Sequence, residues 1–416
     1  MKRAYVIGAG LAGLVAAERL SAEGREVILL EASPKAGGRC RSYRDEKLGR
    51  VIDNGNHLVL SANTAVLDWA DRIGGRAALT VGEAAYPFLD LQSGTQWTIR
   101  PGRGPLGAIT SNARPPGVSL GALLKDMTRL IAAGPSRTVR AAVGGGPAWD
   151  AFWDPMTRAV LNEAPDVGSA ALLRAALLRS FARGAAAARP VFAPQGLGPA
   201  LIDPALETLA RRGVVPKLRT PVQSLEGDER IRAIKAGGET HSLASDDVAV
   251  VAVPPRQAAE LLADARFPPP GQSILNAHFL VPESGLPPLL ALLGGVAHWL
   301  FRRGDVVSVT VSAEEASPLA DANRTDALAH LWEDVSGAVA AHGGKVPEEL
   351  PPSRLLRERS ATFDQSPDGV AARHGPKTHW PNLFLAGDHV ATGLPATLEG
   401  AVRSGETAAR LALCAA

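Results

Sequence analysis

The sequence predicts an α/β fold built around a parallel sheet, and three widely separated segments predict it. The first is an apolar strand at residues 4–7 that leads through a glycine turn at residues 8–13 into a helix. The second is Gly-Gly-Arg at residues 37–39, and the third is an apolar strand at residues 383–386 followed by Gly-Asp. A strand, a glycine turn and a helix in this order begin a βαβ unit. Because the third segment lies near the other end of the chain, one domain must be assembled from distant parts of the sequence.

The glycine turn has the spacing G-x-G-x-x-G. Gly8 permits the tight turn, Gly10 lets the backbone approach a pyrophosphate, and Gly13 lets the helix pack closely against the strand. The helix is predicted over residues 11–23, with Gly24 as its C-terminal stop, and it points free N–H groups at the phosphates. The residues expected to contact a dinucleotide here are Gly8, Ala9, Gly10, Leu11, Ala12 and Gly13.

An acidic residue ends the next predicted strand, at residues 26–31. Glu31 follows Gly13 at close to the ~20-residue spacing expected for a carboxylate that binds ribose hydroxyls. Its charge disfavours the 2′-phosphate of NADP, and we expect the neighbouring Ala32 to line the same site. The turn and the acid together predict a Rossmann-like dinucleotide-binding domain.

The two remaining segments distinguish an FAD-binding domain from an NAD-binding domain. A plain NAD-binding fold does not need a second glycine turn, whereas Gly37, Gly38 and Arg39 resemble a turn of the amine oxidase and phytoene desaturase superfamily. That resemblance implies that the glycines admit an extended FAD and that the arginine approaches its pyrophosphate. It also implies that Asp388, directly after Gly387, meets the ribityl chain and phosphate region. We therefore expect FAD as the cofactor.

A last helix is predicted after this Gly-Asp pair, as far as about residue 413. Thr397 suits its N-cap, and Glu399 lies in the first turn, where an acid is favoured by the helix dipole. A helix N-terminus aimed at the flavin pyrimidine would stabilise the negative charge of the reduced flavin. Pro395, Ala396 and Thr397 are therefore expected to contact the cofactor.

Length and composition exclude several classes of protein. A chain of 416 residues suits about two domains, and a net charge of +2 gives no electrostatic case for binding nucleic acid. Cys40 and Cys414 form no C-x-x-C, so we expect no redox dithiol, no thiolate metal site and no disulfide framework, and a cytoplasmic setting. No second G-x-G-x-x-G follows a predicted strand. We therefore expect no separate NAD(P)H domain, and electrons must come through the substrate pocket, from oxygen or from an unidentified donor.

The two domains are expected to be discontinuous in sequence. The cofactor domain takes residues 1–75, 191–255 and 379–416, and an inserted mixed α+β substrate domain takes residues 76–190 and 256–378. Further strands are predicted at residues 214–218, 222–226, 247–253 and 306–312, and helices at residues 120–133 and 170–186. The superfamily resemblance implies that backbone near Val222 contacts the adenine and that Val253 ends a sheet strand beside the cofactor.

A narrower resemblance covers nearly the whole chain. Its most specific pieces are I-D-N-G-N-H at residues 52–57 and T-G-L-P-A-T-L-E-G-A at residues 392–401. They resemble the hydroxysqualene dehydroxylase family, first described as squalene-associated FAD-dependent desaturases of hopanoid biosynthesis. One position departs from the family pattern, because His389 follows Gly-Asp where a tryptophan is usual. The resemblance implies that reduced FAD delivers a hydride from N5 to an allylic cation, so that hydroxysqualene becomes squalene.

This chemistry needs an acid, because hydroxide is a poor leaving group. The family resemblance implies that residues 54–57 pass the isoalloxazine ring, which adds Asn54, Gly55, Asn56 and His57 to the expected cofactor contacts. We rank His57 first as the acid, with Asn56 orienting flavin or substrate. His278 is the second candidate for the acid, and His389 is expected to be a flavin neighbour. Arg189 would either orient the substrate or tie the two domains together.

Other functions and a lipid contact stay open at this stage. A desaturase of carotenoid-like polyenes or an amine oxidase would share the superfamily, although an amine oxidase normally shows an aromatic cage and this chain has only three Tyr. A non-catalytic prenyl-binding protein is disfavoured by the intact cofactor residues. No apolar run reaches the ~20 residues of a membrane span. For a long-chain isoprenoid alcohol substrate we expect peripheral contact with the inner face of the cell membrane, through residues 286–301 or 120–133, unless both segments are core.

Overall fold

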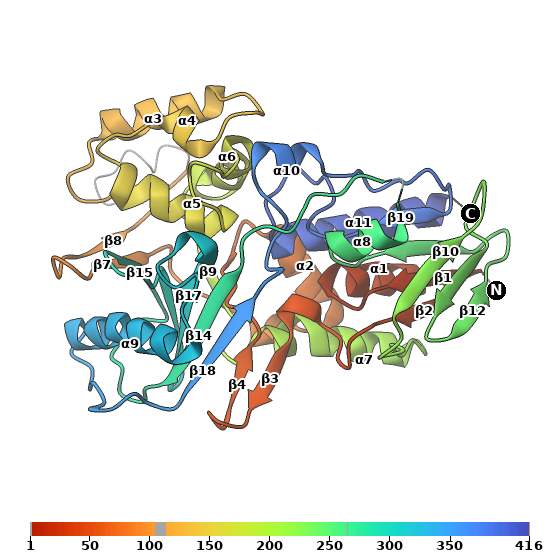
Figure 1. Ribbon diagram of the computed structural model, residues 1–416, viewed down its shortest axis with the longest axis horizontal. Helices are drawn as coiled ribbons and strands as arrows, with labels where there is room; N and C mark the ends of the chain where they lie inside the picture. Colours follow the sequence, from red (N-terminus) through yellow and green to blue (C-terminus); the bar gives the residue numbers. More distant parts are fainter. Residues whose placement is uncertain (1, 105–113, 264, 416) are drawn as a thin grey trace.

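The computed structural model describes residues 2–104, 114–263 and 265–415. It shows an elongated molecule in which a parallel sheet flanked by helices lies at one end and a larger mixed sheet lies at the other (Figure 1). A lobe of helices stands above the mixed sheet, and both chain termini lie at the far end of the parallel-sheet region. The boundaries given above for the two domains stay predictions.

The parallel sheet joins the segments that the motifs singled out. Its strand order is β19-β13-β1-β2, and every pairing within it is parallel. The strands are β1 (Arg3–Ile7), β2 (Glu26–Leu30), β13 (Val248–Val251) and β19 (Leu383–Leu385). The prediction that one domain is assembled from both ends of the chain is therefore confirmed.

Two helices cover one face of this sheet. They are α1 (Leu11–Ala22), which ends before Gly24 as predicted, and the C-terminal helix α11 (Leu398–Cys414). The helices approach closely at Gly405, where a β-carbon would lie 2.4 Å from the carbonyl oxygen of Ala12. The other face carries a three-stranded antiparallel sheet and a short helix: β10 (Val222–Glu226), β11 (Ala233–Ala236), β12 (Glu239–Ser242) and α8 (Pro255–Leu261).

The strand predicted at residues 214–218 is wrong. Only Lys217 forms an isolated parallel bridge, with Leu30, and the rest of this segment is a loop. Its backbone bonds run to residues around Glu31, whose N–H donates to the Lys217 carbonyl at 2.9 Å. The apolar pattern thus marks a single point of pairing at the sheet edge, and a proline at position 216 limits further pairing.

The second region is built on a seven-stranded sheet of order β18-β14-β17-β16-β15-β7-β8. Its strands are β7 (Tyr86–Asp90), β8 (Gln96–Ile99), β14 (Ile274–Leu280), β15 (Leu289–Leu293), β16 (Trp299–Arg303), β17 (Val306–Val311) and β18 (Ser353–Glu358). Helix α9 (Arg324–Ala341) packs against this sheet and closes a core with residues such as Phe279 and Val309. The strand predicted at residues 306–312 is confirmed.

The expectation that residues 286–301 contact a membrane is wrong. This segment forms β15 and the start of β16, and Leu286, Leu289 and Leu292 are each 2% exposed. Its apolar side chains are therefore core residues of the seven-stranded sheet. Among the described residues, no helix combines the length and the apolar character that crossing a bilayer requires.

The helical lobe consists of α3 (Leu120–Ala132), α4 (Val139–Val143), α5 (Asp154–Leu161) and α6 (Ala170–Arg179). The helix predicted at residues 120–133 is confirmed, but the one predicted at 170–186 ends early, at Arg179. A short 3₁₀ turn follows, and Gly184 then adopts φ +80°. The helix ends at its C-cap Ser180, where the backbone leaves the helical conformation with φ −112° and ψ −91°.

Shorter elements connect these regions. They are the hairpin β3 (Ser42–Asp45) and β4 (Arg50–Asp53), the small sheet of β5 (Val59–Leu60), β9 (Pro190–Phe192) and β6 (Thr80–Val81), and the helices α2 (Thr64–Ile73), α7 (Asp203–Arg211) and α10 (Pro367–Ala371). The hairpin leads directly into residues 54–57, which brings that loop from the glycine turns toward the mixed sheet.

Candidate active site

The first glycine turn has the geometry that a phosphate site needs. Gly8 adopts φ +104°, and a β-carbon at Gly13 would lie 1.9 Å from the Gly8 carbonyl oxygen, so both positions require glycine. At Gly10, by contrast, nothing lies within 4 Å of where a β-carbon would stand. Gly10 is also the N-cap of α1 and offers no side-chain acceptor. The open space beside Gly10 and the N–H groups of α1 therefore suit a phosphate.

Glu31 is fixed at the end of β2 by main-chain groups. Its two carboxylate oxygens accept hydrogen bonds from Ala9 N (2.7 Å) and Ser33 N (2.8 Å). Because each carboxylate oxygen has a further lone pair and the side chain is half-buried, the group can still accept from ribose hydroxyls. Ala32 beside it is exposed.

The second glycine turn lies directly against the first. Gly37 N donates to the Ala9 carbonyl at 2.8 Å, and Gly10 and Gly37 form a parallel bridge. Gly37 and Gly38 adopt φ +101° and +52°, a conformation that favours glycine. A β-carbon at Gly38 would lie 3.4 Å from the Cα of Gly10. A bulkier residue at Gly38 would narrow the space between the two turns, and one at Gly37 would press on Arg41 and Ile202.

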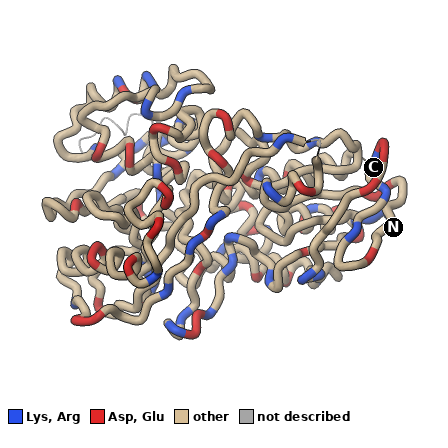
Figure 2. Tube along the Cα trace, viewed as in Figure 1, with Lys and Arg blue, Asp and Glu red and all other residues tan. Residues whose placement is uncertain are grey.

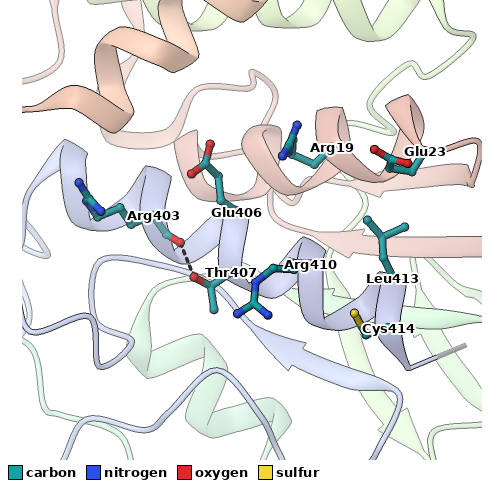
Figure 3. Close-up of a pocket in the computed structure, with 8 residues that line it drawn as sticks. All are labelled: Arg19, Glu23, Arg403, Glu406, Thr407, Arg410, Leu413 and Cys414. Atoms are coloured by element: carbon teal, nitrogen blue, oxygen red, sulfur yellow. Dashed lines mark hydrogen bonds between the residues drawn. The ribbon is translucent and has the colours of Figure 1, made fainter.

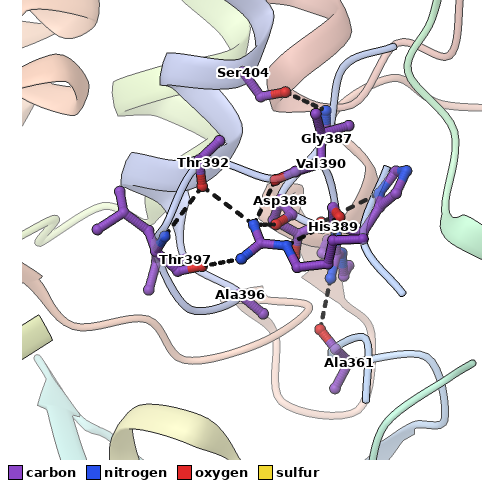
Figure 4. Close-up of polar contacts among 12 residues, drawn as sticks. Ala361, Gly387, Asp388, His389, Val390, Thr392, Ala396, Thr397 and Ser404 are labelled. Carbon is purple, nitrogen blue, oxygen red and sulfur yellow. Dashed lines mark hydrogen bonds and ion pairs between the residues drawn. The ribbon is translucent and has the colours of Figure 1, made fainter. Parts of the chain in front are cut away.

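Arg39 joins the second segment to the third. Its guanidinium donates to Asp388 Oδ1 at 2.7 Å and to the Ala361 carbonyl at 2.6 Å (Figure 4). Burial favours the neutral form of Asp388, but the adjacent Arg39 guanidinium outweighs it and holds the pKa of this carboxyl below its usual range. The pair therefore places one fixed negative and one fixed positive charge beside the glycine turns.

Arg373, which sequence analysis missed, shapes the loop after Asp388. It donates to the carbonyls of Asp388 (3.0 Å), His389 (3.2 Å), Leu394 (2.9 Å) and Val390 and to Thr392 Oγ1 (3.2 Å). The guanidinium also lies over the ring of Phe363, 4.7 Å from its centroid. Burial lowers the pKa of Arg373 to about 10. No local pattern around Arg373 signals this role, because all its partners are main-chain or hydroxyl oxygens of a distant segment.

The N-terminus of α11 is held in place from two sides. Thr397 Oγ1 accepts from Gly400 N at 3.1 Å, which confirms the predicted cap. Glu399 is buried and accepts from Ala65 N and Val66 N, so it also caps the start of α2. Ala396 N donates to Gln365 Oε1 at 2.8 Å. These contacts fix the first turn of α11 next to the Gly-Asp pair.

Comparisons with known proteins agree with this geometry. The family model for flavin containing amine oxidoreductases matches residues 11–413. A hydroxysqualene dehydroxylase of Rhodopseudomonas palustris is 42% identical and covers 100% of this chain and 99% of its own length. One of Sinorhizobium fredii is 39% identical over 99% of this chain and 98% of its own length. The chain belongs to the hydroxysqualene dehydroxylase family of flavin-containing amine oxidoreductases. It is an FAD-dependent oxidoreductase.

Solved structures of the amine oxidoreductases share the fold at low identity. Cyclohexylamine oxidase of Brevibacterium oxydans superimposes with a TM-score of 0.73 at 15% identity, covering 99% of both chains. A putrescine oxidase variant gives a TM-score of 0.71 at 17% identity. At this identity the likeness supports the α/β FAD-binding fold and says nothing of the substrate.

The residues present fit an extended FAD. The open space at Gly10, the paired glycine turns and the charges of Arg39 and Asp388 follow one another along the carboxyl ends of β1, β2 and β19. Val253 lies beside Gly8, its Cγ1 3.3 Å from where a β-carbon would stand, and Val222 begins β10. A small hollow next to this line is bounded by Arg39, Pro254, Pro255, Thr362, Phe363 and Asp388.

Another hollow lies away from this line of residues. About 540 Å³ lies between the C-terminal halves of α1 and α11, with mostly charged side chains around it (Figure 3). They are Arg19, Glu23, Arg403, Glu406, Thr407, Arg410, Leu413 and Cys414. Because the glycine turns lie at the opposite, N-terminal end of α1, this hollow is no part of the cofactor site.

The family loop at residues 54–57 bridges the cofactor site and the mixed sheet. Asn54 Nδ2 donates to Glu358 at 3.0 Å, and Asn56 Nδ2 donates to Asn276 Oδ1 (3.2 Å) and Thr310 Oγ1 (3.1 Å). Asn56 is thus anchored on β14 and β17. Gly55 lies against the His57 ring, 3.5 Å from Nε2 to the position of a β-carbon.

The three histidines considered as acids or flavin neighbours are all neutral near pH 7. The pKa of His57 is lowered by burial, and by Arg39 to a smaller extent, although Asp53 opposes the shift. Burial lowers the pKa of His278 to about 3 and that of His389 to about 4. His278 lies on β14 and is a fully buried core residue. Its Nδ1 lies 2.8 Å from Oγ of Ser308 on the neighbouring strand β17.

His389 and Arg189 are placed by packing. The His389 ring lies under Gly387, within 2.6 Å of where a β-carbon would stand, and its Nδ1 is 4.0 Å from Asp388 Oδ1. Gly387 adopts φ +142° and leaves room for this ring. Arg189 donates from Nε to the Gly82 carbonyl at 2.8 Å and from its main-chain N–H to Ser61 Oγ. These contacts suit its role as a tie between segments.

Proposed function

We propose that this protein removes the hydroxyl group of hydroxysqualene and replaces it with hydride, giving squalene and water. The observation that carries the proposal is the full-length identity of 34–42% to three proteins named hydroxysqualene dehydroxylase. The meeting of the three predicted cofactor segments in one place supports it. The reaction balances if carbon receives one hydride as the C–O bond breaks, and the departing hydroxide takes one proton from the acid and leaves as water; bound FAD would end two electrons more oxidised.

We propose that the chain holds FAD through the residues named from the sequence. The N–H groups of α1 at Leu11, Ala12 and Gly13 would bind the pyrophosphate, with Arg39 adding positive charge, and Glu31 would bind the ribose. Asp388 would accept from the ribityl hydroxyls. The capped first turn of α11, at Pro395, Ala396 and Thr397, would face the pyrimidine and favour its negative charge. When bound and reduced, FAD supplies the hydride.

Exclusion of water would protect the allylic cation. The helical lobe supplies an apolar interior beside the start of α11, because its core of Leu130, Trp153 and Leu173 extends to Phe363 and to Ala396. Aromatic side chains Phe152, Phe181, Trp97 and Trp299 continue this packing onto β7 and β15. Such surroundings suit a long isoprenoid alcohol and offer aromatic faces to a cation.

His57 is the side chain that we propose to act on the leaving hydroxyl. Arg39, Asp53 and Asp388 are its charged neighbours, so it lies at the junction of the cofactor segments. Because its pKa is lowered, the charged imidazolium is the minor form at pH 7, and the proton must be gained before it is given up. Asn56, held on β14 and β17, would position the loop that carries His57.

The acid role gives a pH dependence with a definite sign. At pH values above the lowered pKa of His57, the single-turnover rate should fall about tenfold for each unit by which the pH is raised, because the charged form becomes rarer. The rate should level off once the pH is below that pKa. His57→Ala should keep FAD and slow turnover by roughly 10²–10⁴-fold, without that slope. Asn56→Ala should show a smaller loss. A rate in His57→Ala equal to that of the wild type would remove His57 from the reaction.

The function itself is tested by anaerobic incubation of pre-reduced protein with detergent-dissolved hydroxysqualene and mass analysis of the product. Squalene is the expected product. Desaturation of a carotenoid precursor by the protein in its oxidised form, with the alcohol left unchanged by the reduced form, would favour the desaturase alternative. The electron donor is proposed to be a separate molecule, and contact with the inner face of the cell membrane is proposed to be peripheral.

A further inference from the structure

One face of α3 is unusual for the surface of the molecule. Leu124 and Ile131 are 48% and 49% exposed, whereas Leu123 and Leu130 of the same helix are buried. Leu124, Thr128 and Ile131 follow a spacing of four and three residues, so they form one stripe on the outer side of the helix. A soluble lobe gains nothing from two exposed large aliphatic side chains in one line.

Basic side chains lie beside this stripe. Lys125 and Arg129 occupy the next row of α3, and exposed Arg137 and Arg140 follow in the connection and in α4. The only acid between residues 114 and 149 is Asp126, which is buried and accepts from Trp153 Nε1 at 3.0 Å. Among the described residues, none of these four basic side chains forms an ion pair. Figure 2 shows the resulting blue segments along the outer edge of the lobe.

The apolar interior of the lobe runs from this face toward the cofactor site. Leu130 on the inner side of α3 belongs to the same core as Phe363, and Ala396 at the start of α11 packs against that core. The inner side of α3 and the start of α11 thus belong to one continuous apolar core.

We propose that the face formed by α3 and α4 docks on an anionic phospholipid surface, from which the substrate enters the helical lobe. An amphipathic helix with aliphatic side chains on one stripe and cations on the next lies in the plane of such an interface. The inference rests on the proposed function for the identity of the substrate. The location of the docking face rests on the exposed aliphatic and basic side chains of α3 and α4.

A second exposed patch provides a matched control. Val215 and Leu218, 70% and 41% exposed, lie on a loop of the parallel-sheet region, next to exposed Lys217 and Arg219. The patch is similar in composition, but its neighbour Val214 belongs to the core under the parallel sheet, and the core of the helical lobe does not reach it. The hairpin of β3 and β4 offers exposed Arg44 and Lys47 as a charge-matched control.

The experiment measures sedimentation of the full-length FAD-bound protein with vesicles. Wild type should bind vesicles of equal parts phosphatidylcholine and phosphatidylglycerol, less so as salt rises, and should bind pure phosphatidylcholine weakly. Each basic residue near an anionic surface raises the partition coefficient about fivefold. The double variant Lys125→Glu, Arg129→Glu should therefore lower this coefficient at least roughly twentyfold. Leu124→Ser with Ile131→Ser should lower it about tenfold.

The control variants show whether vesicles bind at α3 and α4 or elsewhere on the protein. Val215→Ser with Leu218→Ser, and Arg44→Glu with Lys47→Glu, should each bind within about twofold of wild type if docking is local, because lipid attraction falls off within a Debye length. Equal losses in control and α3 variants, or equal binding of wild type to both kinds of vesicle, would overturn the proposal. Turnover of detergent-dissolved hydroxysqualene reports the proposed function separately, and the α3 variants should keep it.

Discussion

Two buried carboxyl groups show how differently the cofactor region and the helical lobe are built. Asp388, 5% exposed, lies 2.7 Å from Arg39, and its pKa is held below the usual range despite burial. Glu163, 2% exposed at the end of α5, has no cationic partner among the described residues, and burial raises its pKa to about 7. The cofactor region thus pairs a buried carboxylate with a cation, whereas the lobe buries the Glu163 carboxyl group without one.

The difference teaches where function constrains this chain. A buried ion pair carries a desolvation cost, and the pair of Arg39 and Asp388 lies where the three cofactor segments meet. The lobe is fixed by apolar packing, which tolerates changes of similar size. Substitutions in the two regions should therefore differ in kind as well as in magnitude.

The largest effect is expected within the first glycine turn. Gly13→Val would drive a side chain into the Gly8 carbonyl, 1.9 Å from the β-carbon position, and should cost well over about 3 kcal/mol of folding free energy. Gly10→Val meets open space, so the apo-protein should keep its melting temperature and lose FAD binding. Thermal unfolding of apo-protein and FAD titration separate the two. Similar unfolding in both variants would mean that Gly10 has only a structural role.

This contrast shows what the sequence could and could not predict. The turn at Gly8 and Gly13, the strand end before Glu31 and the cap at Thr397 were predicted correctly because short-range spacing alone fixes such features. Arg373 was missed because its oxygen partners lie on another segment and are mostly main-chain groups. The end of α6 was misplaced because the apolar pattern continues past Ser180, where the backbone leaves the helical conformation. The contacts of these residues with FAD itself stay predictions.

The second largest effect is expected at the ion pair of Arg39 and Asp388. Asp388→Asn leaves the Arg39 guanidinium without its carboxylate partner and should destabilise the apo-protein by about 2–4 kcal/mol. The stability that Asp388 provides is present above the unfolded pKa and is lost as pH falls through the lowered folded pKa. Asp305→Asn, in the exposed pair with Arg50, should leave stability close to that of the wild type. Equal denaturant midpoints for Asp388→Asn and wild type would contradict the account of this pair.

A smaller effect of opposite sign is expected in the lobe. Because the folded pKa of Glu163 lies above its unfolded value, the folded state holds the proton more tightly, and stability is lost as pH rises from about 4.5 to about 7. Glu163→Gln should therefore gain about 1–3 kcal/mol at pH 8 and little at pH 4. Urea unfolding at both pH values measures the difference. A variant that is destabilised at pH 8 but not at pH 4 would show that Glu163 is ionised and paired in the folded protein.

The most direct test of the whole account follows the hydride. Enzyme whose flavin is reduced in D₂O, so that N5 carries deuterium, is mixed anaerobically in D₂O with hydroxysqualene for a single turnover, and the product is analysed for the position of the label. The account predicts squalene with one deuterium on the carbon that lost oxygen, and Gly10→Val, which cannot hold FAD, should yield none. Unlabelled squalene, or deuterium at any other carbon, would contradict hydride transfer at the site formed by the three segments.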